Sequence, residues 1–297
     1  MKSRSTIWAV FVILLVSSSL TWPVMKWGSD LISPLWFGFG RIAVAMTGIF
    51  LLLAFTRSLA WPKRGDFKLI AIVGIFQMAL FIVFAHLGIE HLHAGHANIL
   101  CYATPLFVVP AGIAFHGEKI NRLKAFGFLL CLLGVGVLFS PMNLDWSHGE
   151  AWFASGLLLL SAAGWGISIL AVRHLRPVSP LPVLQAWQSL LACLLCLGLA
   201  LLFEPEANIV WSPQTAGVLL FTGLIAGAFG QWAMMLVQKE LPSQVSSTAF
   251  LSIPVVTLFT SAFLVGEPLT GAKLIAATLV ILGSLAVTFA HRADSAA

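Results

Sequence analysis

Residues 97 to 139 read ANILCYATPLFVVPAGIAFHGEKINRLKAFGFLLCLLGVGVLF, and a version of this stretch returns 149 residues later, at residues 246 to 288. The alignment needs no gap. It places Pro105, Gly117, Glu118, Lys124 and Gly134 on Pro254, Gly266, Glu267, Lys273 and Gly283. Apolar segments match easily by chance, but five such residues seldom keep a fixed register by chance. We therefore predict two homologous halves, residues 1–145 and 146–297.

The composition indicates whether the surface of this protein faces water or lipid. Hydrophobic residues make up 59% of the sequence and charged residues 9%, and the mean hydropathy is +0.98. A soluble domain needs more polar groups to cover its surface, whereas a surface in contact with lipid needs few. The apolar runs are longer than the roughly 9–11 residues of a membrane strand. We therefore expect an all-α membrane protein.

The apolar runs define the predicted spans. A helix needs about 20 apolar residues to cross a hydrocarbon core about 30 Å thick, and proline marks many of the breaks between the runs. Ten spans are predicted, at residues 6–27, 34–56, 67–88, 95–115, 121–140, 151–172, 180–203, 214–236, 243–265 and 271–290. Lys2 and Arg4 precede the first run as they would in a signal peptide, but this run is longer than a signal core. We keep it in the mature protein.

The basic residues give the orientation. With a cytoplasmic N-terminus, Lys273 is the only basic residue in the outer loops. Lys26 and Arg41 fall inside spans, and every other lysine and arginine lies on the inner side. This bias places both termini in the cytoplasm. Because each half has five spans, the second half enters the membrane from the opposite side. The two halves are thus predicted to be inverted five-helix repeats, which are typical of transporters.

Several of these features together resemble a known family, the EamA type of the drug/metabolite transporter superfamily. They are Trp22 and Lys26 in the first span, Arg41 early in the second, and the helices of Pro105 and Pro254, which are closed by Gly117-Glu118 and Gly266-Glu267. The resemblance implies movement of small metabolites, commonly export of amino acids and related compounds. It also implies a central cavity lined by spans 1, 3, 4, 6, 8 and 9.

Polar and aromatic side chains deep in the spans are the candidates for substrate binding. Asn98 and Tyr102 lie one helical turn apart on one stripe, as do Gln77 and Phe81. Since lipid-facing positions at this depth are usually aliphatic, deep tryptophans favour a cavity. The candidate set is Trp22, Gln77, Phe81, Asn98, Tyr102, Thr104, Trp165, Trp232, Ser247 and Ser252. The alternative for each is packing or hydrogen bonding between helices.

A second set of residues is assigned to structure or gating. A charge inside a membrane usually faces a polar interior, although a lysine near a span end reaches the interface. Each glutamate after a glycine is expected to accept hydrogen bonds from the free N–H groups of the helix that follows. The set is Lys26, Arg41, Pro105, Pro254, Glu118 and Glu267.

Two other functions are less well supported by the sequence. A metal-ion carrier would use Glu90, His91, His93 and His96, but their spacing is not that of a helical zinc site, and we expect them in a solvated outer loop. An intramembrane enzyme would need acids at depth, and all the acids fall in loops or at helix ends. We therefore expect no catalytic residues and no bound metal. Nucleotide-binding motifs are absent, so we expect no cofactor and no nucleic-acid partner.

The mode of transport follows from the charges. Ion-coupled carriers usually hold a carboxylate, or unwound backbone carbonyls, at mid-membrane, and no Asp or Glu lies near the middle of any predicted span. His86, toward the outer end of the third span, is the candidate for proton coupling. We expect an inner-membrane facilitator that acts as a monomer and exports aromatic or other apolar amino acids or related compounds by alternating access.

Overall fold

The computed structural model describes residues 4–117, 120–139, 149–175, 177–240 and 252–296, and this part of the chain is helical apart from short connections. The long helices are α1 (Arg4–Gly28), α2 (Pro34–Phe55), α7 (Arg122–Leu138), α8 (Glu150–His174), α9 (Leu181–Phe203) and α14 (Gly271–Ala296). The shorter segments are η1 (Arg64–Asp66), α3 (Phe67–Ile72), η2 (Val73–Leu80), α4 (Phe81–His91), α5 (Ala94–Cys101), α6 (Pro105–His116), α10 (Pro213–Leu220), η3 (Phe221–Phe229), α11 (Gly230–Glu240) and α13 (Ile253–Val265). The predicted all-α class is confirmed.

Among the described residues, eight helical stretches are long and apolar enough to cross a membrane. They correspond to eight of the predicted spans, with boundaries that differ by a few residues. The fifth predicted span is α7, which has 17 residues. The ninth is described only in its second part, as the 13 residues of α13. The total of ten spans and the inversion of the two halves stay predictions.

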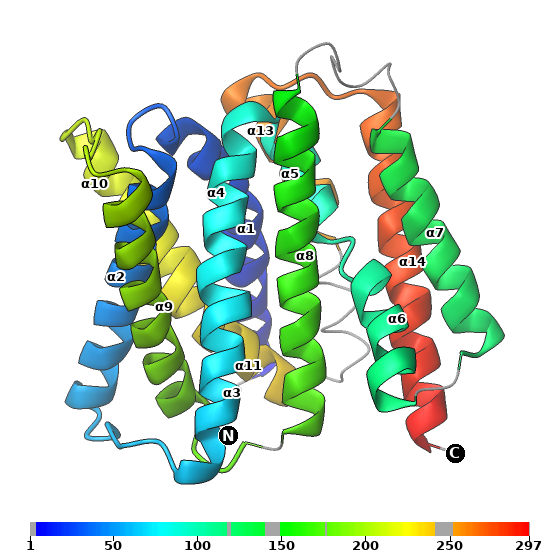
Figure 1. Cartoon of the computed structure of the whole chain (residues 1–297), viewed down its shortest axis with the longest axis horizontal. Helices are drawn as coiled ribbons and strands as arrows, with labels where there is room; N and C mark the ends of the chain where they lie inside the picture. The colour runs from blue at the N-terminus through cyan, green and yellow to red at the C-terminus, as the bar shows by residue number, and fades with distance from the viewer. Residues whose placement is uncertain (1–3, 118–119, 140–148, 176, 241–251, 297) are drawn as a thin grey trace.

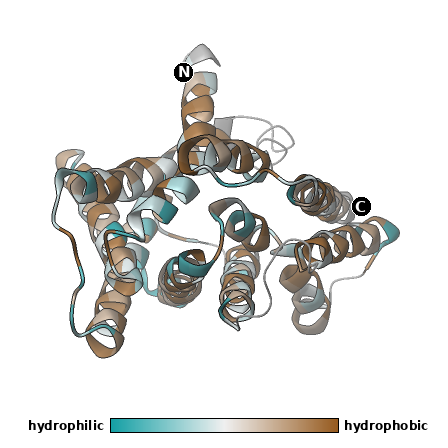
Figure 2. Ribbon diagram, turned by 90° about the horizontal axis from the view of Figure 1, so that it is seen from above, coloured by the Kyte–Doolittle hydropathy of each residue, from teal (hydrophilic) through white to brown (hydrophobic). Residues whose placement is uncertain are grey.

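The helices run roughly alongside one another, and both ends of the chain lie at the same end of the bundle (Figure 1). We call this end the terminal face and the opposite end the far face. In the view from above, most of the helical ribbon is hydrophobic, and the hydrophilic colour gathers mainly in the connections (Figure 2). Large apolar side chains such as Phe55, Phe115 and Phe263 are exposed, as expected where the surroundings are lipid.

The fourth predicted span bends in its middle. α5 ends at Cys101 and α6 begins at Pro105, whose ring lacks the N–H that would donate to the preceding turn. The connection forms a tight turn, because the N–H of Ala103 donates to the carbonyl of Leu100, three residues earlier, at 3.1 Å. Tyr102 and Thr104 therefore lie at a bend inside the membrane-spanning stretch.

Two spans contain π-helical segments at related places. η2 begins at Val73, between α3 and α4, and η3 begins 148 residues later at Phe221, between α10 and α11. π-Helical segments are rare and occur frequently at functional sites. The nearly equal spacing matches the offset of the sequence repeat.

α7 and α14 pack backbone against backbone at one side of the bundle (Figure 1). A Cβ added to Gly127 would lie 2.6 Å from the carbonyl oxygen of Gly283, and a Cβ added to Gly283 would lie 2.5 Å from that of Gly127. The Cys131 thiol, on the same face, approaches the carbonyl of Val280 at 3.6 Å. Gly283 belongs to the repeated motif, and the close packing of α7 on α14 explains why this position holds a glycine.

Glu267 caps a helix, as predicted, but the helix is not the one that follows it. Gly266 ends α13 in the left-handed conformation, at φ +70°, and the buried carboxylate of Glu267 accepts from the N–H groups of Ala94 and Gly95 at 2.5 and 3.1 Å. The expectation of a bond to α14 is therefore wrong, because α13 packs against α5 and brings the carboxylate to the start of that helix. Glu118, its counterpart in the repeat, lies outside the described residues.

Two other acids join distant segments in the same way. Glu204, after α9, accepts from the N–H of Leu35 at 3.1 Å, at the start of α2. Asp66, before α3, accepts from the N–H groups of Val178 and Ser179 at 2.8 and 2.9 Å, just before α9. Glu204 satisfies an N–H group that an isolated helix start leaves unpaired, and Asp66 holds the connection that leads into α9.

Candidate functional site

A cavity of about 390 Å³ lies between the helices. Six of the ten predicted substrate-binding residues line it: Trp22, Gln77, Phe81, Tyr102, Thr104 and Trp165. Arg41 and Pro105, which were assigned to structure or gating, also line it. The fold thus brings together side chains from segments that are far apart in the sequence.

Aromatic rings form much of the cavity wall. Phe81 and Trp165 meet edge to face, with ring centroids 5.0 Å apart. Trp22 lies on α1 with 7% of its surface exposed, and Tyr102 lies at the bend between α5 and α6. Such rings bind apolar and aromatic groups by stacking, and cations through their faces.

Small residues on both sides of Trp165 allow α8 to approach its neighbours closely. A Cβ added to Gly164 would lie 2.7 Å from the carbonyl oxygen of Phe76 in η2, and a Cβ added to Gly166 would lie 3.1 Å from a methyl group of α6. The sequence Gly164-Trp165-Gly166 therefore permits a close backbone approach while presenting one large ring. That approach places the Trp165 ring against Phe81.

The polar part of the wall is made of amides and hydroxyls. The described lining residues with such groups are Ser18, Thr21, Gln77, Tyr102, Thr104, Gln231, Ser284 and Thr288. The hydroxyls of Thr21 and Thr104 donate to carbonyls of their own segments at 2.8 and 3.0 Å, which leaves their oxygen lone pairs as acceptors. The side-chain amides of Gln77 and Gln231 make no hydrogen bond to another described residue, so they are free to bind a ligand.

Four predicted residues lie elsewhere. Asn98, on α5, is fully buried, and neither atom of its amide has a partner among the described residues. Trp232 packs beside Phe229, with ring centroids 5.6 Å apart, and is not among the lining residues. Ser252 precedes α13 without lining the cavity, and Ser247 lies outside the described residues.

Comparison with known families decides the class of protein. The model of the EamA-like transporter family matches residues 6–140 and 152–289 of this chain. The chain belongs to the EamA-like transporter family. The resemblance drawn from the spacing of Trp22, Arg41, Pro105 and the two Gly-Glu pairs is confirmed. Together with its apolar helices, this membership makes the chain a multi-pass membrane transporter.

Named relatives agree with this family. An uncharacterized transporter of Bacillus subtilis, YoaV, is 26% identical over 275 residues, covering 91% of this chain and 92% of the relative. A probable amino-acid metabolite efflux pump of Salmonella typhimurium is 28% identical over 211 residues, 67% of this chain and 69% of the pump. A probable terminal-alkyne amino-acid exporter of Streptantibioticus cattleyicolor is 23% identical over 296 residues, 97% and 94% of the two chains. These names indicate transporters rather than enzymes.

A solved crystal structure shares the fold of this EamA-like transporter. It superposes with a TM-score of 0.64 at 18% identity and covers 95% of this chain and 99% of its own. At this identity the likeness concerns the fold alone.

The cavity of this EamA-like transporter has contributions from more helices than the resemblance implied. The expected first, third, fourth, sixth, eighth and ninth spans all contribute, and Arg41 of α2 and three residues of α14 are added: Ser284, Val287 and Thr288. The α14 residues escaped the prediction, although Ser284 and Thr288 are one turn apart in an apolar helix. That spacing is the signal that points to a polar stripe.

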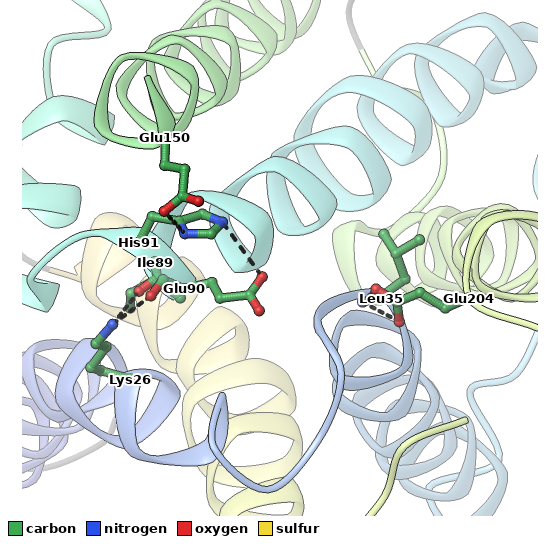
Figure 3. A network of polar contacts seen from close by, with 7 residues as sticks. All are labelled: Lys26, Leu35, Ile89, Glu90, His91, Glu150 and Glu204. Carbon is green, nitrogen blue, oxygen red and sulfur yellow. Dashed lines mark hydrogen bonds and ion pairs between the residues drawn. The ribbon is translucent and has the colours of Figure 1, made fainter. Parts of the chain in front are cut away.

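Polar contacts join three cavity-lining spans at the far face (Figure 3). Lys26 of α1 donates to the carbonyls of Ile89 and Glu90 at 2.9 and 2.8 Å, at the end of α4. The His91 ring lies 3.6 Å from the carboxylate of Glu150, at the start of α8, and 3.9 Å from that of Glu90. Lys26 therefore caps a helix end instead of facing the cavity, which agrees with its structural assignment.

The outer histidines do not form one solvated cluster. His96 is fully buried within α5, so the expectation of a loop is wrong there; the capping carboxylate of Glu267 starts that helix before His96. Burial, and next the charge of Lys273, lower the pKa of His93 from its ordinary value. His91 is exposed and paired with acids. Within the described residues, no three potential metal ligands gather, and nothing here favours the metal-ion carrier.

Proposed function

We propose that this EamA-like transporter exports amino acids with aromatic or other apolar side chains, or closely related compounds, across the inner membrane. The cavity carries the proposal. It has a volume of about 390 Å³ and a wall that contains aromatic rings, amides and hydroxyls. Pockets of a few hundred Å³ with an apolar wall and a few polar groups are typical small-molecule sites. The efflux pump and the exporter among the relatives support this class of substrate.

The contacts at the far face support alternating access. Lys26 and His91 join α1, α4 and α8 there, and Glu267 joins α13 to α5. These segments also line the cavity. Exchange between the two faces requires that such contacts break and reform, and inverted halves would supply the two conformations. With cytoplasmic termini, as the positive-inside rule predicts, these contacts lie on the outer side of the membrane.

We further propose that the transporter is a facilitator. Among the described residues that line the cavity there is no Asp or Glu, and the sequence of residues 241–251 contains none either. His86 is buried against Phe37, with ring centroids 4.3 Å apart, and does not line the cavity. A proton on His86 would therefore have no direct contact with a substrate in the cavity.

Counterflow in proteoliposomes tests both proposals. Vesicles loaded with unlabelled phenylalanine should take up labelled phenylalanine without any pH or sodium gradient, whereas protein-free vesicles should not. A panel of other amino acids, run in the same way, defines the range of side chains. Failure of every amino acid to exchange would contradict the substrate class. Uphill accumulation driven by a proton gradient, and lost in His86→Ala, would contradict the facilitator.

A further inference from the structure

Arg41 brings a positive charge into the cavity. It lies seven residues after Pro34, where α2 begins, which is about 10 Å along the helix. Its side chain is part of the cavity wall, and Nη1 lies 2.9 Å from the sulfur of Met25 on α1. A thioether is a weak acceptor, so this contact orients the guanidinium without balancing its charge.

No carboxylate balances Arg41 among the described residues. It is the only charged residue in the described wall of the cavity, and no ion pair involving it is formed there. The charge of Arg41 acts on the nearby ring of His86. Histidine has no negatively charged form near neutral pH, so His86 cannot balance this charge. Holding an unpaired charge at this depth costs a large free energy, which a bound anion would offset.

We propose that Arg41 is the carboxylate anchor of the substrate site, so that the transported compounds are carboxylates with an aromatic or apolar body. This inference rests on the proposed function, because it takes the cavity to be the transport site. The guanidinium presents a planar pair of N–H donors that matches a carboxylate and forms two parallel hydrogen bonds. Amino acids and simple monocarboxylates fit this requirement, whereas amines, amides and metal cations do not.

The remaining wall matches the rest of such a molecule. Met25, which holds the guanidinium, lies one helical turn from Trp22 on α1. The pair formed by Phe81 and Trp165 provides an aromatic surface in the same cavity. A carboxylate bound at Arg41 therefore leaves its side chain among aromatic rings. The free amides of Gln77 and Gln231 offer oxygen acceptors for an ammonium group.

A purely structural role for Arg41 makes a different prediction. If the guanidinium only tied α2 to α1 through Met25, its replacement would weaken the binding of every ligand to the same extent. If it binds a carboxylate, only ligands that carry this group lose affinity. The charge of the ligand, varied at constant body size, separates the two roles.

The test measures binding of four phenyl compounds to the purified full-length transporter: phenylalanine, 3-phenylpropionate, phenylalaninamide and phenethylamine. The wild type should bind the two carboxylates about 10- to 100-fold more tightly than the amide or the amine, the range expected for a charge-assisted pair. Arg41→Gln should remove this preference while leaving the affinity for the amide unchanged, and Arg41→Lys should keep part of it. Lys68→Gln, which removes an exposed charge on α3, should behave as the wild type.

The outcomes separate this inference from the proposed function. Equal affinity of the wild type for acid and amide, or an equal loss for both in Arg41→Gln, would overturn the anchor even if phenylalanine is transported. Arg41-dependent binding of 3-phenylpropionate without any transport of amino acids would uphold the anchor and contradict amino-acid export. Binding of none of the four compounds would contradict both.

Discussion

Two regions of the bundle are built from similarly apolar helices but pack differently. α7 and α14 form a tight pair, whereas the helices around the cavity leave space between them. In the pair, Gly127 and Gly283 bring two backbones so close that a methyl group has no space. In the cavity wall, glycines beside Trp165 bring α8 close to η2 and α6, yet the rings of Phe81 and Trp165 border a cavity of about 390 Å³. The size of a few side chains therefore decides whether a helix contact is structural or forms a site. Added volume should damage the first region, and removed volume should damage the second.

Adding volume between α7 and α14 should have the largest effect. In Gly127→Leu the new side chain would collide with the backbone of α14, where a Cβ alone comes within 2.6 Å of an oxygen. Such overpacking costs about 3 kcal/mol or more, and we expect little folded protein by size-exclusion chromatography. Gly136→Leu is the matched control on α7, since no atom lies within 4 Å of a Cβ placed there. A normal yield of Gly127→Leu would show that the close approach is not required.

The second largest effect is expected where Glu267 caps the start of α5. Glu267→Gln keeps the shape but weakens the two charge-assisted bonds to the start of α5, and we expect a loss of about 1–3 kcal/mol in the free energy of unfolding. Denaturant titration in detergent measures this loss. Glu206→Gln serves as the control because Glu206 is exposed. If both variants unfold alike, the buried carboxylate does not stabilise this contact.

Removing a ring from the cavity should affect transport more than folding. Trp165→Ala removes the partner of Phe81 and should lower kcat/KM for phenylalanine about tenfold, the size expected for one aromatic contact. Tyr102→Ala should act in the same direction. Trp152→Ala, also on α8 but exposed and outside the cavity wall, should leave transport near wild type. Unchanged transport in both cavity variants would return Trp165 and Tyr102 to a packing role.

The smallest effect is expected at the exposed pair of the far face. The side chains of His91 and Glu150 are 34% and 74% exposed, and surface ion pairs contribute about 0–1 kcal/mol. His91→Ala should therefore change the transport rate less than about fivefold in the counterflow assay. A loss comparable to that of Trp165→Ala would show that this contact controls opening of the far face.

Much of the fold could be predicted from local signals. The helices of Pro105 and Pro254 were expected to close at Gly117 and Gly266, and both helices end there, with each glycine in the left-handed conformation. Aromatic residues at depth predicted Trp22 and Trp165 in the cavity wall. These signals depend on backbone geometry, or on the contrast between an aromatic ring and its aliphatic neighbours.

Other features depend on how each helix is rotated against its neighbours. Arg41 could be placed inside the second span, but not in the cavity wall. His96 was placed in a loop because Glu267, the residue that starts its helix, comes from the other half of the chain. In a uniformly apolar span, the lipid-facing and protein-facing sides have similar compositions. The spacing of residues in the sequence therefore gives little information on which side of the helix faces the protein.

Protection of the cavity by substrate tests the central claim most directly. In a variant without Cys101, Cys131, Cys193 and Cys196, Thr104→Cys places one thiol at the cavity wall, where a water-soluble thiosulfonate reagent should label it and stop transport. Saturating phenylalanine should slow this labelling, while labelling of Ser58→Cys, exposed beyond α2, should not change. If the unlabelled Thr104→Cys variant transports phenylalanine, but its labelling proceeds at the same rate with and without phenylalanine, the cavity is not the substrate site.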